Sequence, residues 1–471
     1  MLSLLNLLPY SRLAMLHRFF LLLLLAFPLT ALHAADPIVE KTLGNGLKVI
    51  VLPDHRAAVA VQQAWYRAGS MDESYGTTGV AHVLEHMMFK GTPKVPAGEF
   101  SRRIAALGGR ENAFTSRDHT AYFQTVQASR LPQAMALEAD RMTHLSLDAD
   151  EFAKELDVVK EERRMRTEDN PHSRLYEQLM ASAFVAHPYR HPVIGWMNDL
   201  DNLTVADARA WYSRWYTPNN AILVIAGDVD PAQVFAWAEQ HYGTIPAREI
   251  PARKPQTEPA PQGMRHLQLK APAKLPMAIL AWRAPKLESA HLSRSPHALE
   301  ILAGVLSGHE AARLPQALVK TRHIALEANA KYDALSRGPA LFTADVSVAE
   351  GGDLNAAIAA LKGEISRVAR EGISPAELAR VKAQVLAAQV FEQDSLFYRA
   401  MQIGSWETAG LSWRDRATWL DGLKSVTAAE VQAAAANWLT DDRLTLAELV
   451  PQPMPENAPP TARGSGGRHA R

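Results

Sequence analysis

Apolar and polar positions follow one another along the first half of the chain in patterns that predict both strands and helices. An apolar, largely β-branched run over 47–52 follows the turn at 44–46, and a second run covers 59–66. Runs of this length and composition, bounded by turn residues, are typical of strands. The pattern further predicts helices at 79–90, 98–107, 130–146, 149–168, 172–184 and 204–215, and strands at 119–127 and 221–226.

A similar order of elements returns after a proline-rich break. Five prolines lie among charged and amide residues between 246 and 261, a composition typical of an extended linker. Beyond it we expect strands around 265–283, 323–348 and 443–449, and helices at 292–306, 353–370, 375–392 and 426–438.

The repeated order predicts an α+β fold. We expect two similar domains, each a mainly antiparallel sheet packed with helices, facing each other across a cleft. The predicted limits are 36–245 for the N-terminal domain, 246–262 for the linker and 263–451 for the C-terminal domain.

The N-terminus has the pattern of a secretory signal. Arginines precede the nine apolar residues from Phe19 to Phe27, and small residues follow, including Ala34 and Ala35. Nine residues are too few for a bilayer, which needs about 20 in a helix. We therefore expect residues 1–35 to be a cleaved signal peptide of a periplasmic protein without a stable membrane anchor; an uncleaved anchor is the alternative. Residues 452–471, rich in Pro, Gly and Arg, are expected to form a disordered tail.

Charge and cysteine content exclude several classes of function. The 471 residues include 50 basic and 50 acidic side chains, so a nucleic-acid partner that needs a strongly basic surface is not expected. Cysteine is absent, which excludes disulfides, catalytic thiols and thiolate metal sites. Any bound metal must therefore be held by histidine and carboxylate side chains.

The strongest chemical signal is the segment His82-Val83-Leu84-Glu85-His86. On a helix with about 100° per residue, His82 and His86 lie about 40° apart, so that their imidazoles can converge on one ion. Glu85 lies about 60° from His82, near enough to accept a proton from a water activated by the metal. Apolar residues at helical spacing give the same helix a buried side. A plain pair of surface histidines is the alternative.

A third ligand is needed, because catalytic zinc usually has three protein ligands and one open position. The predicted helix at 149–168 offers Glu155 and Glu162, which lie two turns apart beside an apolar stripe. One of these carboxylates is suited to bind the metal, and the other is suited to orient a metal-binding histidine. From the residues alone, a solvated helix rich in charges is the competing interpretation.

Several short segments, taken in their order along the chain, resemble the pitrilysin/insulinase family of zinc metallopeptidases, whose motif is H-x-x-E-H. The resemblance covers 38–450, is strongest from 42 to 230, and is greatest to bacterial and mitochondrial processing-type peptidases of two-domain length. The segments that carry it are Leu43-Gly44-Asn45-Gly46-Leu47, 79–92, Gly108-Gly109-Arg110-Glu111-Asn112-Ala113-Phe114-Thr115, Thr120-Ala121-Tyr122, 155–162, His187-Pro188-Tyr189, Asn219-Asn220 and Gly227-Asp228.

The resemblance implies a zinc endopeptidase with one Zn²⁺ per chain that hydrolyses peptides or unfolded segments. The family's third ligand follows the second histidine by about 76 residues, which leads from His86 to Glu162. The implied roles are zinc ligation by His82, His86 and Glu162, general base catalysis by Glu85, support of a ligand by Glu155, and substrate binding by Asn112 and Ala113.

One departure from the family's sequence pattern bears on the partner subunit that we expect for this chain. The second domain of the family usually carries an Arg and a Tyr that hold the substrate, but Val319 and Leu326 stand at the matching positions. The resemblance therefore implies a sister subunit that supplies the pair. The alternative is a homodimer in which Arg322 or Tyr332 substitutes.

Two other functions compete with this interpretation. A non-catalytic assembly or chaperone-like subunit of the same family would have no use for a base beside a metal, so the intact H-x-x-E-H motif argues against it. A metal hydrolase of small molecules would not need the strand at Asn112 and Ala113, because only an extended peptide pairs with a strand.

Overall fold

The computed structural model describes residues 37–289 and 293–454. The expected signal peptide lies outside the described residues, as does all of the expected tail beyond 454. The described residues from Ile38 onward belong to one compact unit. Within the described part of the chain, no helix is both long and apolar enough to cross a membrane.

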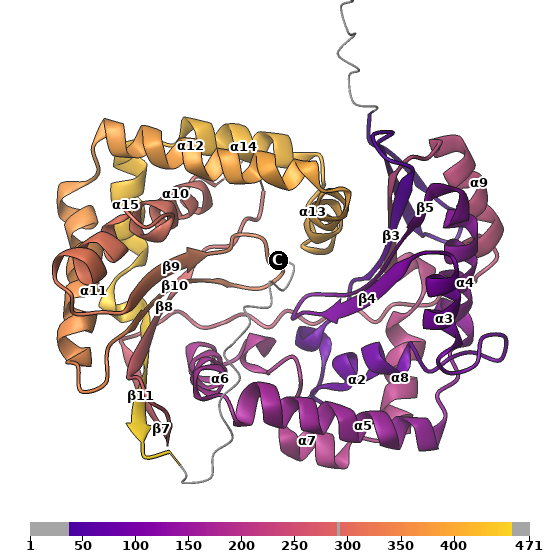
Figure 1. Ribbon diagram of the computed structural model, residues 1–471, viewed down its shortest axis with the longest axis horizontal. Helices are drawn as coiled ribbons and strands as arrows, with labels where there is room; N and C mark the ends of the chain where they lie inside the picture. The colour runs from indigo at the N-terminus through magenta and orange to yellow at the C-terminus, as the bar shows by residue number, and fades with distance from the viewer. Residues whose placement is uncertain (1–36, 290–292, 455–471) are drawn as a thin grey trace, which may run out of the picture. The chain divides into compact units, whose positions relative to one another are not determined.

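The first half of this unit contains six strands and a set of helices (Figure 1). The strands are β1 (Val39–Thr42), β2 (Lys48–Pro53), β3 (Val59–Tyr66), β4 (Arg110–Thr115), β5 (Thr120–Gln127) and β6 (Ala221–Gly227). The helices are α2 (Val80–Met87), α3 (Glu99–Ala106), α4 (Leu131–His144), α5 (Ala149–Arg163), α6 (Pro171–Ala183), α7 (Met197–Asn202), α8 (Val205–Trp215) and α9 (Pro231–Tyr242).

The second half has five strands. They are β7 (Arg265–Pro272), β8 (Met277–Ala284), β9 (Glu327–Tyr332), β10 (Ala340–Ser347) and β11 (Leu444–Gln452). Its helices are α10 (Ser295–Ser307), α11 (Leu354–Glu371), α12 (Pro375–Phe391), α13 (Leu396–Thr408), α14 (Asp415–Ser425) and α15 (Ala428–Trp438).

The two sheets have the same topology. The first has the order β1-β2-β6-β3-β5-β4 and the second has the order β7-β11-β8-β10-β9. When β2 to β6 are matched in chain order with β7 to β11, the two orders coincide, and β1 is the one addition. In both sheets a single pair is parallel, β2 with β6 and β7 with β11, and every other pair is antiparallel. The predicted α+β fold of two similar, mainly antiparallel halves is confirmed.

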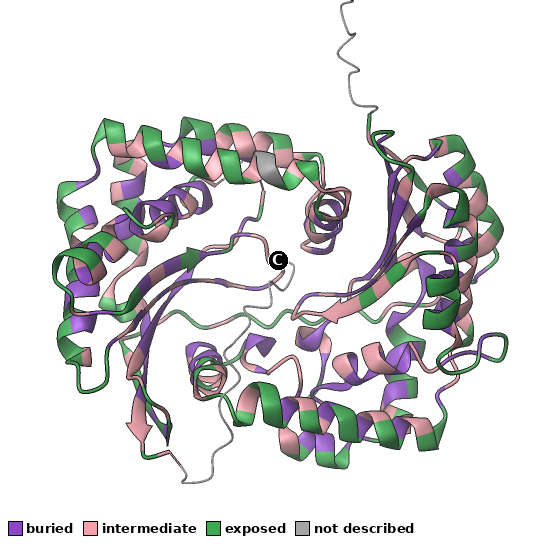
Figure 2. Ribbon diagram, in the orientation of Figure 1, coloured by how far each residue is buried: buried purple, intermediate pink, exposed green. Residues whose placement is uncertain are grey.

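Each sheet has one face covered by the helices of its own half and the other face covered by a helix of the opposite half. Helix α13 places Ala400, Met401 and Ile403 against strands of the first sheet. Helix α6 places Leu175 and Leu179 against the second sheet. Because both faces of each sheet are packed, the central strands are buried almost throughout (Figure 2). This exchange of helices α13 and α6 joins the two halves by buried apolar contacts.

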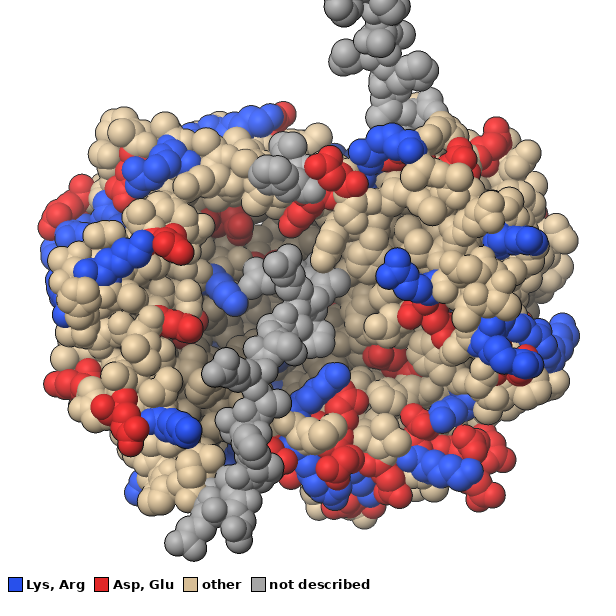
Figure 3. All heavy atoms as spheres, viewed as in Figure 1, with Lys and Arg blue, Asp and Glu red and all other residues tan. Residues whose placement is uncertain are grey.

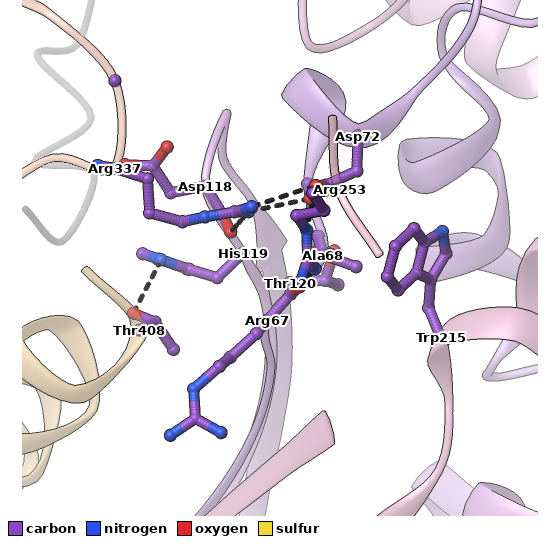
Figure 4. Close-up of polar contacts among 12 residues, drawn as sticks. Arg67, Ala68, Asp72, Asp118, His119, Thr120, Trp215, Arg253, Arg337 and Thr408 are labelled. Atoms are coloured by element: carbon purple, nitrogen blue, oxygen red, sulfur yellow. Dashed lines mark hydrogen bonds and ion pairs between the residues drawn. The ribbon is translucent and has the colours of Figure 1, made fainter. Parts of the chain in front are cut away.

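Polar contacts also join the halves (Figure 4). Arg337 donates to both carboxylate oxygens of Asp72, at 2.8 and 3.0 Å, and to the carbonyl oxygen of Asp118 at 2.8 Å. His119 faces Thr408, with Nδ1 and Oγ1 3.0 Å apart. The polar composition of 118–119 is typical of a surface turn, but Asp118 is buried and both residues serve these contacts.

Most predicted elements are present, and the linker at 246–262 contains no helix or strand. Four helices were not predicted: α7, α9, α13 and α14. In α13, residues that pack on the first sheet share the helix with Trp406, which packs in the core of the second half. A helix that is buried on several sides lacks the two-sided pattern by which helices are recognised in a sequence.

Candidate active site

Helix α2, which carries the H-x-x-E-H motif, is fixed at its N-terminus by buried polar contacts. Glu73 accepts the N–H groups of Gly79 and Ala81, both at 2.9 Å, and so serves backbone donors that the first turn leaves free. The backbone at Gly79 passes close to the backbone at Gly195, and the two residues have φ angles of 91° and 86°. A Cβ at Gly195 would lie 2.5 Å from the carbonyl oxygen of Thr78, so this crossing requires glycine.

His82 and His86 lie on one side of α2, with ring centroids 4.9 Å apart. Helix α5 packs against α2 and brings Glu162 to them: its carboxylate oxygens lie 3.9 Å from His82 Nε2 and 3.5 Å from His86 Nε2. One nitrogen or oxygen atom from each of the three side chains lies within 4.8 Å of the others. Two imidazoles and one carboxylate are a common donor set for catalytic zinc, so these residues fit that ion.

Protonation favours metal binding at His82. Burial, with a smaller contribution from the nearby His86, lowers the pKa of His82 to about 4. The ring is therefore neutral at physiological pH, which is the form that binds a metal. Burial would also lower the pKa of His86, but hydrogen bonds with Glu162 and Glu155 outweigh this effect and raise it.

Glu155 orients His86 from the outer side. Its Oε2 lies 3.2 Å from His86 Nδ1, which leaves Nε2 directed to Glu162. Metal-binding histidines usually donate their other ring N–H in this way. Lys90 in turn lies 2.5 Å from the second oxygen of Glu155. Nδ1 of His82 is buried and has no such partner in the part of the chain that the structure describes.

Glu85 lies beside the cluster and is held by a residue that the sequence did not reveal. The hydroxyl of Thr115, at the end of β4, donates to Glu85 Oε2 at 2.5 Å. Burial raises the pKa of Glu85 to about 7, while the bond from Thr115 lowers it in part. A buried carboxylate with a high proton affinity suits a general base.

Asn112 and Ala113 lie on β4, which is an edge strand of the first sheet. The N–H of Ser116 donates to the carbonyl oxygen of His119 in the turn after β4. Hydrogen-bonded residues alternate along an antiparallel pair, so the backbone groups of 112, 114 and 116 face β5. The N–H and C=O groups of Ala113 therefore face the open edge. In the structure the Ala113 N–H donates to the side-chain oxygen of Asn112 at 2.9 Å. Figure 2 shows β4 as more exposed than the strand beside it. An extended peptide can add to such an edge.

The residues around Glu85 line a cavity of about 570 Å³. Its lining includes His82, Glu162 and Thr115, together with residues of the turn after β4 and of α6. His187 and His191 flank a short turn at 188–190.

The second half does not supply the missing substrate pair at the expected positions. Val319 lies in a π-helical turn (Pro315–Thr321) and packs on the core of the second half, and Leu326 is an exposed residue before β9. Of the two alternatives, Tyr332 is buried, with its hydroxyl donating to the carbonyl oxygen of Pro285 at 2.5 Å. Arg322 is exposed and lies 3.8 Å from Glu364.

Comparison with known proteins identifies the family. The family described as Insulinase (Peptidase family M16) matches residues 48–195. The chain is 33% identical to the zinc protease PqqE of Helicobacter pylori over 353 residues, which are 72% of this chain and 77% of that protein. The chain belongs to the insulinase (peptidase M16) family. Residues 202–385 match the description Peptidase M16 inactive domain, and among the described residues the only His/Glu metal cluster lies in the first half.

Solved structures of similar proteins extend over nearly the whole described region. A protease from Helicobacter pylori superposes with a TM-score of 0.84 at 27% identity, over 88% of this chain and 99% of that one. The periplasmic protease PqqL of Escherichia coli superposes with a TM-score of 0.76 at 19% identity, over 88% of this chain but 48% of its own. The latter likeness concerns the fold alone.

Proposed function

We propose that this member of the M16 family is a zinc-dependent endopeptidase that hydrolyses peptides or unfolded segments. The observation that carries the proposal is the position of Glu85, bonded to Thr115 beside three convergent metal-binding side chains and next to an open strand edge. A non-catalytic subunit would not need this base, and a hydrolase of small molecules would not need the edge.

Each site residue has a distinct role in the proposed hydrolysis. Bound zinc supplies a Lewis acid that polarises a substrate carbonyl and acidifies water. His82, His86 and Glu162 would hold the ion, and Glu155 would fix the orientation of His86. Glu85 accepts the proton of the attacking water and later passes it to the leaving amine. Ala113 aligns the substrate backbone once a peptide replaces the side chain of Asn112 at its N–H.

We further propose that a sister subunit of the family supplies the substrate-holding Arg and Tyr. The support is the mismatch at Val319 and Leu326, and the burial of Tyr332, which weakens the case for substitution within a homodimer. The likeness to PqqL is in keeping with this idea, since this chain covers about half of that longer protein.

One experiment tests the activity and the partner together. The purified chain is assayed on an unstructured peptide, alone and with a family member from the same organism that lacks H-x-x-E-H. We expect one zinc per chain but feeble cleavage alone, an increase of at least about ten-fold with the sister, and loss of cleavage on chelation. Strong cleavage by the isolated chain that is lost in Arg322→Ala would contradict the heterodimer. Cleavage by neither preparation would contradict the peptidase.

Export to the periplasm is also proposed, from the pattern at 1–35 alone. N-terminal sequencing of the protein from its native host should give a start near Ala35 or Asp36. A chain that keeps the apolar residues after Arg18 would contradict the proposal.

A further inference from the structure

The cavity beside Glu85 is lined by three arginines and three glutamates, but only one arginine and one glutamate of this lining pair with each other. Glu162 lies 2.5 Å from Arg166, Glu177 accepts two bonds from Arg163, at 2.8 and 3.1 Å, and Glu85 accepts the hydroxyl of Thr115. Arg163 itself is not part of the lining. Two of the three lining arginines therefore form no ion pair among the described residues, whereas acidic and basic side chains are intermingled over the face of the molecule in Figure 3.

Arg117 is the principal unpaired cation. It lies in the turn after β4, two residues beyond Thr115, and lines the cavity. Its Nε donates to the carbonyl oxygen of Tyr189 at 3.3 Å, and its guanidinium carbon lies 5.8 Å from the ring centroid of Tyr176. These contacts hold the side chain, yet Arg117 forms no ion pair with any carboxylate in the described part of the chain. Its terminal amino groups remain available, and a guanidinium fork is suited to a carboxylate.

Two further groups beside Arg117 lack acidic partners. His191 is 4% exposed and lines the same cavity, and neither of its ring nitrogens has a hydrogen-bond partner among the described residues. A buried donor without a partner is costly, so a ligand or water must satisfy it. Arg190 donates to the carbonyl oxygen of Val185 at 2.7 Å and, among the described residues, forms no ion pair.

The position of the cavity connects it with the substrate. Ala113 and Thr115 lie on the edge strand, Thr115 contacts the base, and Arg117 follows in the same direction. A peptide that pairs at Ala113 and crosses Glu85 therefore brings its next residue to the cavity. We propose that the cavity binds a carboxylate of the substrate next to the scissile bond, held by Arg117 together with His191. The inference rests on the proposed peptidase function.

The test uses zinc-loaded Glu85→Gln protein, so that binding is measured without cleavage. Where the sister subunit is required, it is present in every sample. Labelled peptides are derived from one that the active preparation cleaves at a single bond, and carry Glu, Gln or Lys on either side of that bond. Each is made with a free and with an amidated C-terminus, which separates an acidic side chain from a terminal carboxylate.

We expect Glu to bind roughly ten-fold more tightly than Gln at one of the two positions, and Lys to bind more weakly than Gln. Adding the replacement Arg117→Gln to this protein should bring the ratio of the affinities for the Glu and Gln peptides close to one. Adding Arg117→Glu instead should favour binding of the Lys peptide. Arg174→Gln is the matched control, because Arg174 lies on α6 but does not line the cavity. It removes the same charge and should leave the ratio unchanged.

Three results would overturn the inference. The first is equal binding of the Glu, Gln and amidated peptides by the protein with Arg117 intact, which decides the matter even if the Arg117 variants fail to fold. The second is a preference for Glu that persists in Arg117→Gln, since Arg117 would then not hold the carboxylate. The third is an equal loss of the ratio in Arg174→Gln, which would indicate a general charge effect. Failure of every zinc-loaded preparation to bind or cleave peptides would instead contradict the proposed function.

Discussion

Glu85→Gln is expected to keep one zinc per chain and to lower peptide cleavage by about 10³-fold, within the 10²–10⁴ that a general base commonly contributes. The amide has nearly the same shape and can still accept the hydroxyl of Thr115, so the helix and the ligands on it remain in place. It cannot accept a proton. Elemental analysis of the purified variant, beside initial rates of peptide cleavage, measures both quantities on one sample.

The control for this variant is Glu161→Gln, which removes a carboxylate from an exposed position on α5. It should retain both zinc and cleavage. Full activity in Glu85→Gln would show that another group acts as the base. Loss of zinc from Glu85→Gln would show that Glu85 is a ligand.

Glu162→Gln and His82→Ala are expected to lose zinc as well as activity. Glu162 supplies the one carboxylate of the cluster, and both of its oxygens face the histidines at 3.9 and 3.5 Å. Replacement of groups that merely orient ligands lowers metal affinity by about 10–100-fold, so removal of a ligand should lower it by at least about 10²-fold. Competition with a chromogenic chelator measures the affinity.

Glu161→Gln is again the matched control, since it changes the neighbouring residue of the same helix by the same chemistry. A zinc affinity in Glu162→Gln equal to that of the control would contradict the assignment of Glu162. Retention of zinc in His82→Ala would do the same for His82.

Local sequence spacing predicted the part of the site that lies on one helix. His82, Glu85 and His86 fall within five residues, and the geometry of an α-helix alone brings them together. The position of Glu162 is different in kind. It depends on the packing of α5 against α2, which no local pattern reveals, so its assignment came from the resemblance to a family. The structure brings it to the histidines, while its role awaits the measurements above.

Residues that act through long-range packing were missed. Thr115 carries no signal in the sequence, because a hydroxyl at the end of a strand meets Glu85 only after β4 and α2 pack together. The same holds for Arg337, whose partners Asp72 and Asp118 come from the other half of the chain. Asp118 and His119 have the polar composition of a surface turn, and only their burial against the second half shows otherwise.

The likeness of the two halves and their mainly antiparallel sheets were predicted from the order of elements, but the exchange of α6 and α13 was not. Both helices carry apolar residues for a sheet of the opposite half, and periodicity indicates that a face is buried without indicating what buries it. Helix α13 also contains Gly404, where a Cβ would lie 2.0 Å from the Trp65 ring. This glycine lowers intrinsic helix propensity, and tertiary packing overrides that preference.

The most direct test of the central claim is anomalous scattering from crystals of the zinc-loaded protein, recorded on both sides of the zinc absorption edge. We expect one edge-dependent peak per chain, in contact with Nε2 of His82, Nε2 of His86 and the carboxylate of Glu162. A peak elsewhere, or none between these three side chains in protein that cleaves peptides, would contradict it.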